Sequence, residues 1–204
     1  MKKVYLLRHG ESKAQLGEEL SFDSELSKNG IKQSKNLKKI LPSINFDIIF
    51  VSPLKRARQT FENTGVSREK VHFDSRLAEM LPSESYSSIL PYQKNFGYGK
   101  PDRHNAWHID PIDRMGNFLN DLYNIKARTI LIVGHAVALS NLLNIFLMRD
   151  SSNGIDKVSF KYSLMNNAAL SVFELAEKKD KNNCDKLLLW NYTEHLRKKG
   201  FFGA

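Results

Sequence analysis

Arginine and histidine side chains follow apolar runs at three places in the sequence. Arg8 and His9 follow the first run, Arg56 lies just after the second, and His135 follows the third. An arginine can bind two oxygens of a phosphate or carboxylate at once, which a lysine cannot do. An imidazole can attack a phosphoryl group and carry it covalently, and backbone N–H groups at helix starts after Gly10 and His135 would add contacts to an anion. The combination predicts an anion site suited to phosphoryl transfer, where catalysis depends on positioning and charge stabilisation.

Alternating strands and helices would bring these groups together. The pattern predicts strands at 3–7, 46–51, 71–73, 129–133, 168–175 and 187–192, and helices at about 27–41, 52–63, 112–125 and 137–147. Ser27 and Ser52 are expected to cap the first two helices, and Ile31 to face inward from the first. Such alternation favours an α/β fold with a mainly parallel sheet covered on both faces. Ligands of such sheets bind beyond the carboxyl ends of the strands, where three of these strands end in the chemical groups named above.

Residues 80–111 break the helical pattern. They contain four of the six prolines and the aromatic residues Tyr86, Tyr92, Phe96, Tyr98 and Trp107. We interpret this stretch as a lid-like insertion within a single domain that spans residues 1–204, because 204 residues are within the reach of one domain.

Composition excludes several classes of protein. Apolar residues make up 41% and charged residues 26% of the chain, as in ordinary globular proteins. No apolar run is long enough to span a membrane, and the N-terminus lacks the pattern of a signal peptide. The only cysteine, Cys184, excludes an internal disulfide and favours a cytoplasmic location. The net charge of +9 is dispersed without a nucleic-acid-binding motif, so we expect neither nucleic acid nor membrane as a partner.

Six segments, in order along the chain, resemble the motifs of the histidine phosphatase superfamily, which includes the cofactor-dependent phosphoglycerate mutases. They read LRHGES at 7–12, LSKNG at 26–30, VSPLKRARQT at 51–60, LAE at 77–79, VGHA at 133–136 and NYTEHL at 191–196. The resemblance implies a three-layer α/β/α sandwich of the phosphoglycerate mutase type. It also implies that His9 is the nucleophile and that Arg8, Arg56 and His135 bind the phosphoryl oxygens. No metal or cofactor is implied.

The resemblance also implies a general acid and two further substrate-binding residues, but the motifs support these less directly than they support His9 and the phosphate-binding residues. Glu79 matches the family's acid, but the residues after it match neither the mutases nor many phosphatases, so Glu84 and Glu11 remain alternatives. Gln15 stands where other members have asparagine, and it is expected to bind substrate together with Ala136.

The substrate class follows from the same motifs. A small phosphorylated substrate is expected, and a metal-independent phosphomonoesterase fits best because the mutase continuation after Glu79 is missing. A phosphoglycerate mutase and a non-catalytic phospholigand-binding protein remain the alternatives. His72 and His195 are expected to be structural, although His195 lies in the last motif. The sequence does not reveal the oligomeric state.

Overall fold

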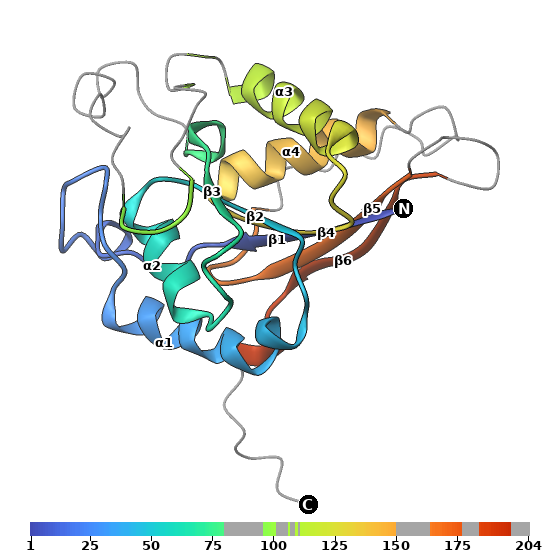
Figure 1. The fold of residues 1–204 in the computed structure, drawn as a ribbon. Coiled ribbons are helices and arrows are strands. Elements are labelled where there is room, and N and C mark those ends of the chain that lie inside the picture. The colour runs from blue at the N-terminus through green and yellow to red at the C-terminus, as the bar shows by residue number, and fades with distance from the viewer. Residues whose placement is uncertain are drawn as a thin grey trace, which may run out of the picture.

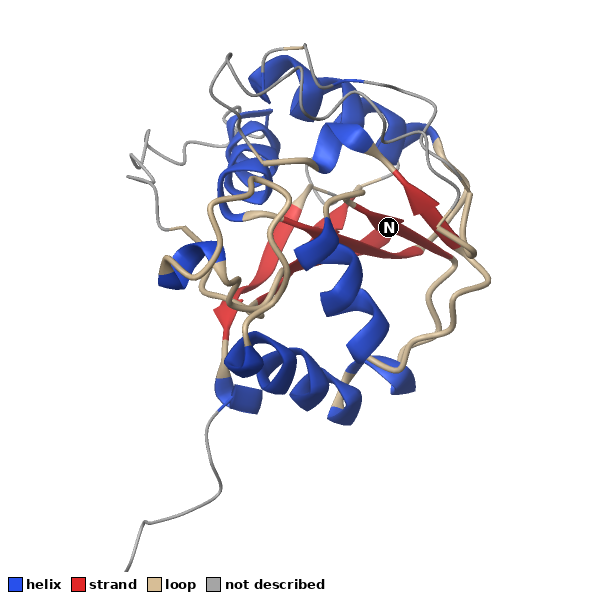
Figure 2. Cartoon of the chain, turned by 90° about the vertical axis from the view of Figure 1, so that its left-hand side faces the viewer, coloured by secondary structure: helices blue, strands red, loops and turns tan. Residues whose placement is uncertain are grey.

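A computed structural model describes residues 1–79, 96–100, 106, 109, 111–149, 164–176 and 184–196. Within these residues six strands form one sheet that lies between two layers of helices (Figures 1 and 2). The strands are β1 (Lys2–Arg8), β2 (Ile48–Val51), β3 (Val71–Phe73), β4 (Thr129–Gly134), β5 (Leu170–Leu175) and β6 (Lys186–Tyr192). The helices are α1 (Lys28–Asn36), α2 (Lys55–Asn63), α3 (Pro111–Asn124) and α4 (Ala136–Arg149).

The sheet is mainly parallel, as predicted. Its strand order is β3-β2-β4-β1-β5-β6, and the first four strands in this order run parallel to their neighbours. Strand β5 is antiparallel to both β1 and β6. Val133 of β4 pairs with Leu7 on one side and with Val51 on the other. The chain segments that follow these three strands therefore start side by side.

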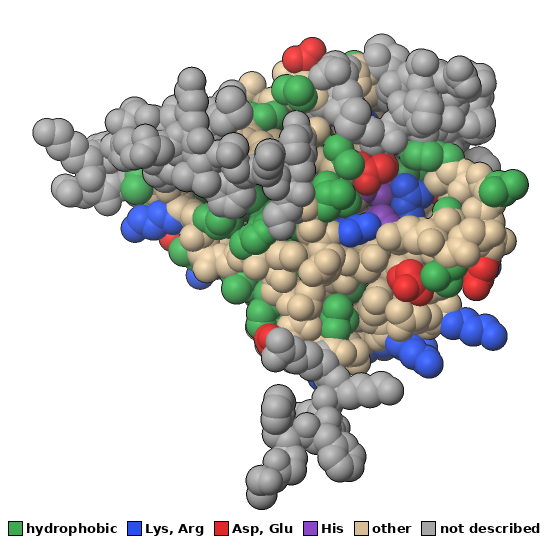
Figure 3. Space-filling model, turned by 180° about the vertical axis from the view of Figure 1, so that it is seen from behind, with side chains coloured by type: hydrophobic (Ala, Val, Ile, Leu, Met, Phe, Trp, Pro, Cys, Tyr) green, Lys and Arg blue, Asp and Glu red, His purple; other side chains and the backbone are tan. Residues whose placement is uncertain are grey.

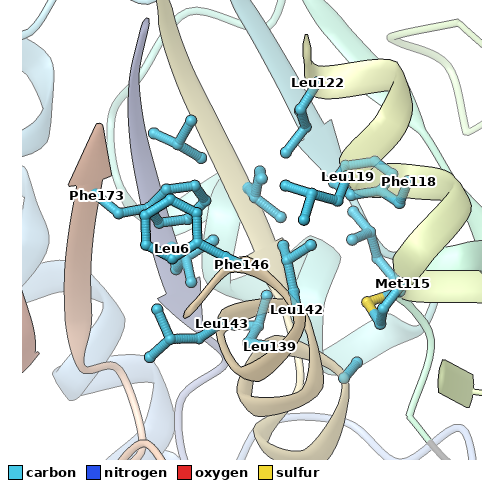
Figure 4. Packing of buried hydrophobic residues seen from close by; sticks show 14 of the residues in the cluster. Leu6, Met115, Phe118, Leu119, Leu122, Leu139, Leu142, Leu143, Phe146 and Phe173 are labelled. Carbon is cyan, nitrogen blue, oxygen red and sulfur yellow. The ribbon is translucent and has the colours of Figure 1, made fainter. Parts of the chain in front are cut away.

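Both faces of the sheet are buried by apolar side chains. In β4, Ile130 and Ile132 pack toward α3 and α4, whereas Leu131 and Val133 belong to the core on the side of α1 and α2. Figure 4 shows the first of these cores, with side chains of α3 and α4 directed toward the strands. This alternation is the period of two that a strand imposes on its side chains. The three-layer α/β/α sandwich expected from the sequence is confirmed.

The first helix is shorter than predicted. Ser27 caps it as expected, and its Oγ accepts a hydrogen bond from Gly30 N at 3.0 Å. The α-helix ends at Asn36, and the chain continues as two 3-10 turns, Leu37–Lys39 and Leu41–Ser43. The proline in the second turn has no N–H with which to continue an α-helix. Ile31, which was expected to face inward, is 36% exposed.

The second helix begins later than predicted, and Ser52 does not cap it. The helix starts at Lys55 with Leu54 at the N-cap position, where no side-chain hydrogen bond is made. Asp23 Oδ1 instead accepts a hydrogen bond from Lys55 N at 2.7 Å, and so satisfies one of the free N–H groups at this end. The Ser52 side chain is thereby available for another contact.

The predicted lid, residues 80–111, lies largely outside the described residues. Phe96 and Tyr98, the aromatic residues of this stretch that are described, contact Phe73 of β3 through their rings. They therefore pack against the edge strand of the sheet. No helix among the described residues is both long and apolar enough to cross a membrane.

Candidate active site

The main chain aligns the first histidine at the carboxyl edge of the sheet. His9 N donates to Gly134 O at 3.0 Å, and Ser52 N donates to Val133 O at 2.9 Å. These bonds continue the strand ladders by one residue beyond β1 and β2. The segments after β1, β2 and β4 are consequently held in register by backbone hydrogen bonds, which fixes where their side chains begin.

The His9 ring has one defined tautomer. Its Nδ1 lies 2.6 Å from Gly10 O, and a carbonyl oxygen can only accept, so Nδ1 carries the proton. Nε2 therefore has a free lone pair. Arg56 Nε donates to this Nε2 at 3.3 Å. The ring is almost completely buried, with 4% exposure, and its Nε2 faces the guanidinium that sequence reasoning assigned to phosphate binding.

Two guanidinium groups are held near this histidine by main-chain carbonyls. Arg56 Nη1 donates to Phe22 O at 2.6 Å, and Arg8 Nη1 donates to Met165 O. Both positive charges act on His9, since each lowers the pKa of its imidazole. The arrangement gives an electropositive site built from β1, from the start of α2 and from the residues before β5.

The second histidine lies next to the first. The rings of His9 and His135 are 4.9 Å apart between centroids, and His135 is completely buried. Its Nε2 is 2.9 Å from Ser52 Oγ, which also accepts a weak hydrogen bond from Leu54 N at 3.4 Å. His135 Nδ1 has no hydrogen-bond partner among the described residues. If Ser52 donates to Nε2, Nδ1 carries the proton and can donate to an anion.

Burial keeps both imidazoles neutral. Desolvation is the largest effect and moves the pKa of His9 and of His135 well below the usual histidine value. The neighbouring charge of Arg56 lowers both pKa values further. Desolvation also lowers the pKa of Arg8, while the charge of Glu79 raises it. A neutral His9 has the lone pair that a nucleophile needs.

Glu79 lies at the start of α4, close to the second histidine motif. Its Oε2 accepts a hydrogen bond from Val137 N at 3.4 Å, at the helix end where a negative charge is favoured. Its charge also acts on Arg8. Glu79 thus lies next to the His135 segment, and the structure brings it near Arg8, one of the predicted phosphate ligands.

The two alternative acids differ in their placement. Glu11 Oε1 accepts a hydrogen bond from Ser27 Oγ at 2.6 Å, and its Oε2 accepts one from Asn29 Nδ2 at 3.3 Å. This carboxylate is therefore engaged at the start of α1. Glu84 lies outside the described residues.

The predicted substrate contacts at Gln15 and Ala136 are at the edge of the site. Gln15 Oε1 accepts hydrogen bonds from Ser12 N at 3.0 Å and from Asn167 Nδ2, also at 3.0 Å. Asn167 Nδ2 in turn lies 3.3 Å from His9 O. Ala136 is the first residue of α4, where its backbone belongs to the N-terminal turn. Gln15 is hence connected to the main chain of His9 through Asn167.

Two glycines explain why the first two motifs occur together. A Cβ atom on Gly10 would lie 2.5 Å from Gly30 O, and a Cβ on Gly30 would lie 2.0 Å from Glu11 O. Both distances are too short for real atoms, and both opposing atoms belong to the backbone. The start of α1 therefore packs directly against the chain that follows His9.

Sequence reasoning missed three residues near the site. Ser52 was interpreted as a helix cap. Asn167 was not predicted, because its contact with His9 joins residues that are far apart in the sequence. Arg114 of α3 is 3% exposed, and its charge lowers the pKa of His135. The sequence did contain a signal for Arg114, because this basic residue directly precedes Met115, which lies on the apolar side of the expected helix.

The site is visible on the surface in Figure 3. Histidine atoms appear between basic side chains, with an acidic side chain beside them. The view agrees with a site that combines histidine, basic and acidic side chains.

Comparisons with known proteins find similarity to phosphatases in sequence and in fold. The model of the histidine phosphatase superfamily (branch 1) matches residues 4–89, which include the segments of His9, Arg56 and Glu79. A curated relative from Arabidopsis thaliana, named "Probable 2-carboxy-D-arabinitol-1-phosphatase", is 26% identical over 201 residues, covering 88% of this chain and 39% of the relative. The chain therefore spans about two fifths of the length of that relative.

Solved structures share the fold along nearly the whole chain. A mutant of phosphoserine phosphatase from Entamoeba histolytica, solved with phosphoserine, has a TM-score of 0.65 at 22% identity and covers 97% of this chain and 100% of its own. A mycobacterial glucosyl-3-phosphoglycerate phosphatase, solved with VO3, has a TM-score of 0.61 at 20% identity and covers 94% and 99%. Residues 4–89 are thus similar to the histidine phosphatase superfamily (branch 1), and the chain shares its fold with solved phosphatases along nearly its whole length.

Proposed function

We propose that this chain is a metal-independent phosphomonoesterase that acts through a phosphohistidine on His9. The observation that carries the proposal is the fixed tautomer of His9, whose Nδ1 donates to Gly10 O while Nε2 keeps its lone pair beside Arg56. The names of the relatives support hydrolysis of phosphate esters: one is a phosphoserine phosphatase and another a glucosyl-3-phosphoglycerate phosphatase.

The first step forms the phosphoenzyme. His9 Nε2 donates its lone pair to phosphorus, the bond from phosphorus to the ester oxygen breaks, and that oxygen takes the proton of Glu79, which enters this step as the neutral carboxylic acid. The guanidinium groups of Arg8 and Arg56 bind the equatorial phosphoryl oxygens, and His135 donates to one of them. Because Arg56 Nε already points at His9 Nε2, an incoming phosphoryl group would replace the imidazole as its acceptor.

The second step regenerates the enzyme. Glu79, now ionised, accepts a proton from a water molecule whose oxygen attacks phosphorus. The bond from phosphorus to Nε2 breaks, and inorganic phosphate leaves with the water's oxygen. His9 returns to its neutral form, which the low pKa caused by burial favours.

Hydrolysis of p-nitrophenyl phosphate tests the proposal. We expect the wild type to be active between about pH 5 and pH 8 with or without EDTA, and the His9→Ala variant to be inactive. His72→Ala is the matched control, because His72 lies on β3 away from the site and its loss should leave activity intact. An EDTA-sensitive wild type, or an active His9→Ala variant, would contradict the mechanism.

The mutase alternative is separated by the fate of the phosphoryl group. A phosphatase releases inorganic phosphate from 3-phosphoglycerate or from another ester, whereas a mutase returns 2-phosphoglycerate. Product analysis by 31P NMR therefore distinguishes the two activities in one experiment.

A further inference from the structure

A short turn before β5 contacts the main chain of the nucleophile. Ala168 N donates to His9 O at 3.0 Å, and Asn167 Nδ2 lies 3.3 Å from the same oxygen. These two bonds hold the carbonyl of His9 from the side opposite to its strand partner β4. The orientation of the imidazole is consequently coupled to the position of residues 165–169, which we call the bracing turn.

The same turn also holds the neighbouring arginine. Arg8 N donates to Ala169 O at 3.2 Å, and the Arg8 guanidinium donates to Met165 O. The bracing turn therefore contacts both residues of the Arg8-His9 pair, one through its backbone and side chain and the other through its backbone.

The backbone of the bracing turn has an unfavourable conformation. Ala168 is completely buried and has a φ of 54°, in the left-handed region that residues other than glycine rarely adopt. Such conformations persist only where surrounding contacts enforce them, and they concentrate at functional sites. Something outside the turn must therefore hold Ala168 in place.

The C-terminal segment supplies that restraint. His195 Nε2 is 3.0 Å from Ala168 O, to which it must donate because a carbonyl cannot. His195 is 9% exposed, and burial lowers the pKa of its ring, so the neutral Nε2–H tautomer is favoured. The bond fixes the carbonyl of the strained residue itself.

A second contact comes from the end of β6. Asn191 Oδ1 accepts a hydrogen bond from Asn166 N at 2.7 Å, and Asn191 also has a φ of 54°. The pairing of β5 with β6 shifts register here, between Leu170 and Val172, which marks a β-bulge. Bulges of this kind reorient a side chain and are frequent beside active sites.

We propose that His195 is a positioning residue that acts through the bracing turn, with Asn191 as its second support. Its hydrogen bond holds Ala168 so that the turn fixes the His9 carbonyl and the Arg8 guanidinium, and thereby aims Nε2 at the phosphoryl group. The motif NYTEHL thus serves the reaction although neither of these side chains touches the substrate. This inference rests on the proposed function for its rate measurement, but not for its binding measurement.

Two variants test the His195 bond. His195→Phe keeps a ring beside Tyr192 but removes the donor, whereas His195→Gln places an amide N–H near the position of Nε2. We expect the phosphoryl-transfer rate of His195→Phe, measured per folded molecule in a single turnover, to fall about ten- to a hundredfold, as small misplacements of reacting groups do. His195→Gln should recover most of the rate.

A third variant covers the case in which His195→Phe fails to fold. Asn191→Gly tolerates the positive φ and removes the acceptor for Asn166 N, so it should also slow transfer while leaving the β6 backbone unstrained. Leu122→Ala is the matched control. It opens a cavity beside α3, on the face of the sheet opposite to Ala168, and should lower stability without changing the rate per folded molecule.

Inorganic phosphate binding, measured by calorimetry, separates this inference from the proposed function. If the wild type binds phosphate but does not hydrolyse esters, the proposed function fails, and weaker binding by His195→Phe still supports the bracing role through Arg8. A His195→Phe variant with wild-type rate and wild-type phosphate affinity would overturn the inference. So would equal losses of rate in His195→Phe and Leu122→Ala, and so would a wild type that neither binds phosphate nor turns over.

Discussion

Arg56 Nε donates a hydrogen bond to Nε2 of His9 over 3.3 Å. The contact joins the two motifs in which these residues occur, although 47 positions separate them in the chain. It also shows which nitrogen of His9 faces the anion site, since Nδ1 is occupied by the Gly10 carbonyl. In the mechanism that we propose, the reacting atom and one charge that would stabilise the transition state are therefore neighbours.

Replacing Arg56 with lysine should therefore damage catalysis more than charge alone would suggest. Lysine keeps the positive charge but loses the flat, two-pronged donor geometry. We expect Arg56→Lys to lower kcat by roughly a hundredfold to a thousandfold, as removal of one donor to a developing oxyanion does. Arg58→Lys on the same helix is the control, because the Arg58 guanidinium stacks on Phe96 outside the site. Similar kcat losses in both variants would indicate a general effect on α2.

The buried serine next to the second histidine gives another prediction. Ser52 Oγ is the only partner of His135 Nε2 among the described residues. Ser52→Ala should therefore remove the hydrogen bond that favours one tautomer of the His135 ring. A loss of about tenfold in kcat/KM is expected, the equivalent of one hydrogen bond of typical strength. NMR of 15N-labelled histidine would show directly whether the protonated nitrogen of His135 changes. An unchanged tautomer together with unchanged activity would show that Ser52 is only structural.

The role of Glu79 is tested by the leaving group. Glu79→Gln should slow hydrolysis of alkyl phosphates by about a hundredfold or more, because a poor leaving oxygen needs a proton. The first step with p-nitrophenyl phosphate, followed as the burst of p-nitrophenol, should be slowed far less because this leaving group needs no proton, whereas hydrolysis of the phosphoenzyme slows for both substrates. Glu11→Gln is the control, since Glu11 is engaged with Ser27 and Asn29 and should leave this dependence on leaving group unchanged. If Glu11→Gln, and not Glu79→Gln, changed the dependence on leaving group, Glu11 would be the general acid.

Close packing at α1 predicts an unusual sensitivity to one methyl group. Gly30→Ala would place a Cβ 2.0 Å from Glu11 O, so the backbone must shift, and we expect a loss of roughly 1–3 kcal/mol in the free energy of unfolding. Gly116→Ala in α3 is the matched control. No atom lies within 4 Å of its added Cβ, and the helix should gain about 0.5–1 kcal/mol. Denaturant unfolding of both variants measures the difference, and a neutral Gly30→Ala would contradict the described contact.

Stability should depend on the two site histidines in a defined direction. The folded-state pKa values of His9 and His135 are lowered well below the usual value of 6.5, so the unfolded chain binds these protons first as the pH falls. Their contribution to stability is therefore fully present above about pH 7 and is lost as the pH falls below 6.5 toward the folded pKa values. The His9→Gln variant should show a shallower decline of the free energy of unfolding across this window than the wild type. A steeper decline in the variant would contradict the sign.

Much of this site could be predicted because its residues follow strands whose ends must meet. His9 and His135 each follow a buried strand, and parallel neighbours in register place the segments after β1 and β4 together. Local chemistry also predicted the Ser27 cap, because an N-cap depends on residues within one turn. The assignment of fold class depended on the same alternation of strands and helices.

The parts that failed depend on contacts between distant residues. Ser52 has the residue type and position of a helix cap, but the helix begins later and His135, 83 positions away, takes its hydroxyl. Asn167 contacts His9 although 158 positions separate them, and no local sequence pattern predicts a contact over that separation. The inward orientation of Ile31 was wrong because Gly30 and Ser34 are the buried residues of α1, and Gly30 is in close contact with the distant Glu11 backbone.

Identification of the phosphorylated atom tests the central claim most directly. The Glu79→Gln variant should accumulate the phosphoenzyme because its second step lacks a base, and an alkaline quench preserves phosphohistidine for peptide mass spectrometry and 31P NMR. We predict a phosphoryl group on Nε2 of His9, the nitrogen beside Arg56. Phosphorylation of Nδ1 or of His135, or turnover by a wild type in which no phosphohistidine forms, would contradict the claim.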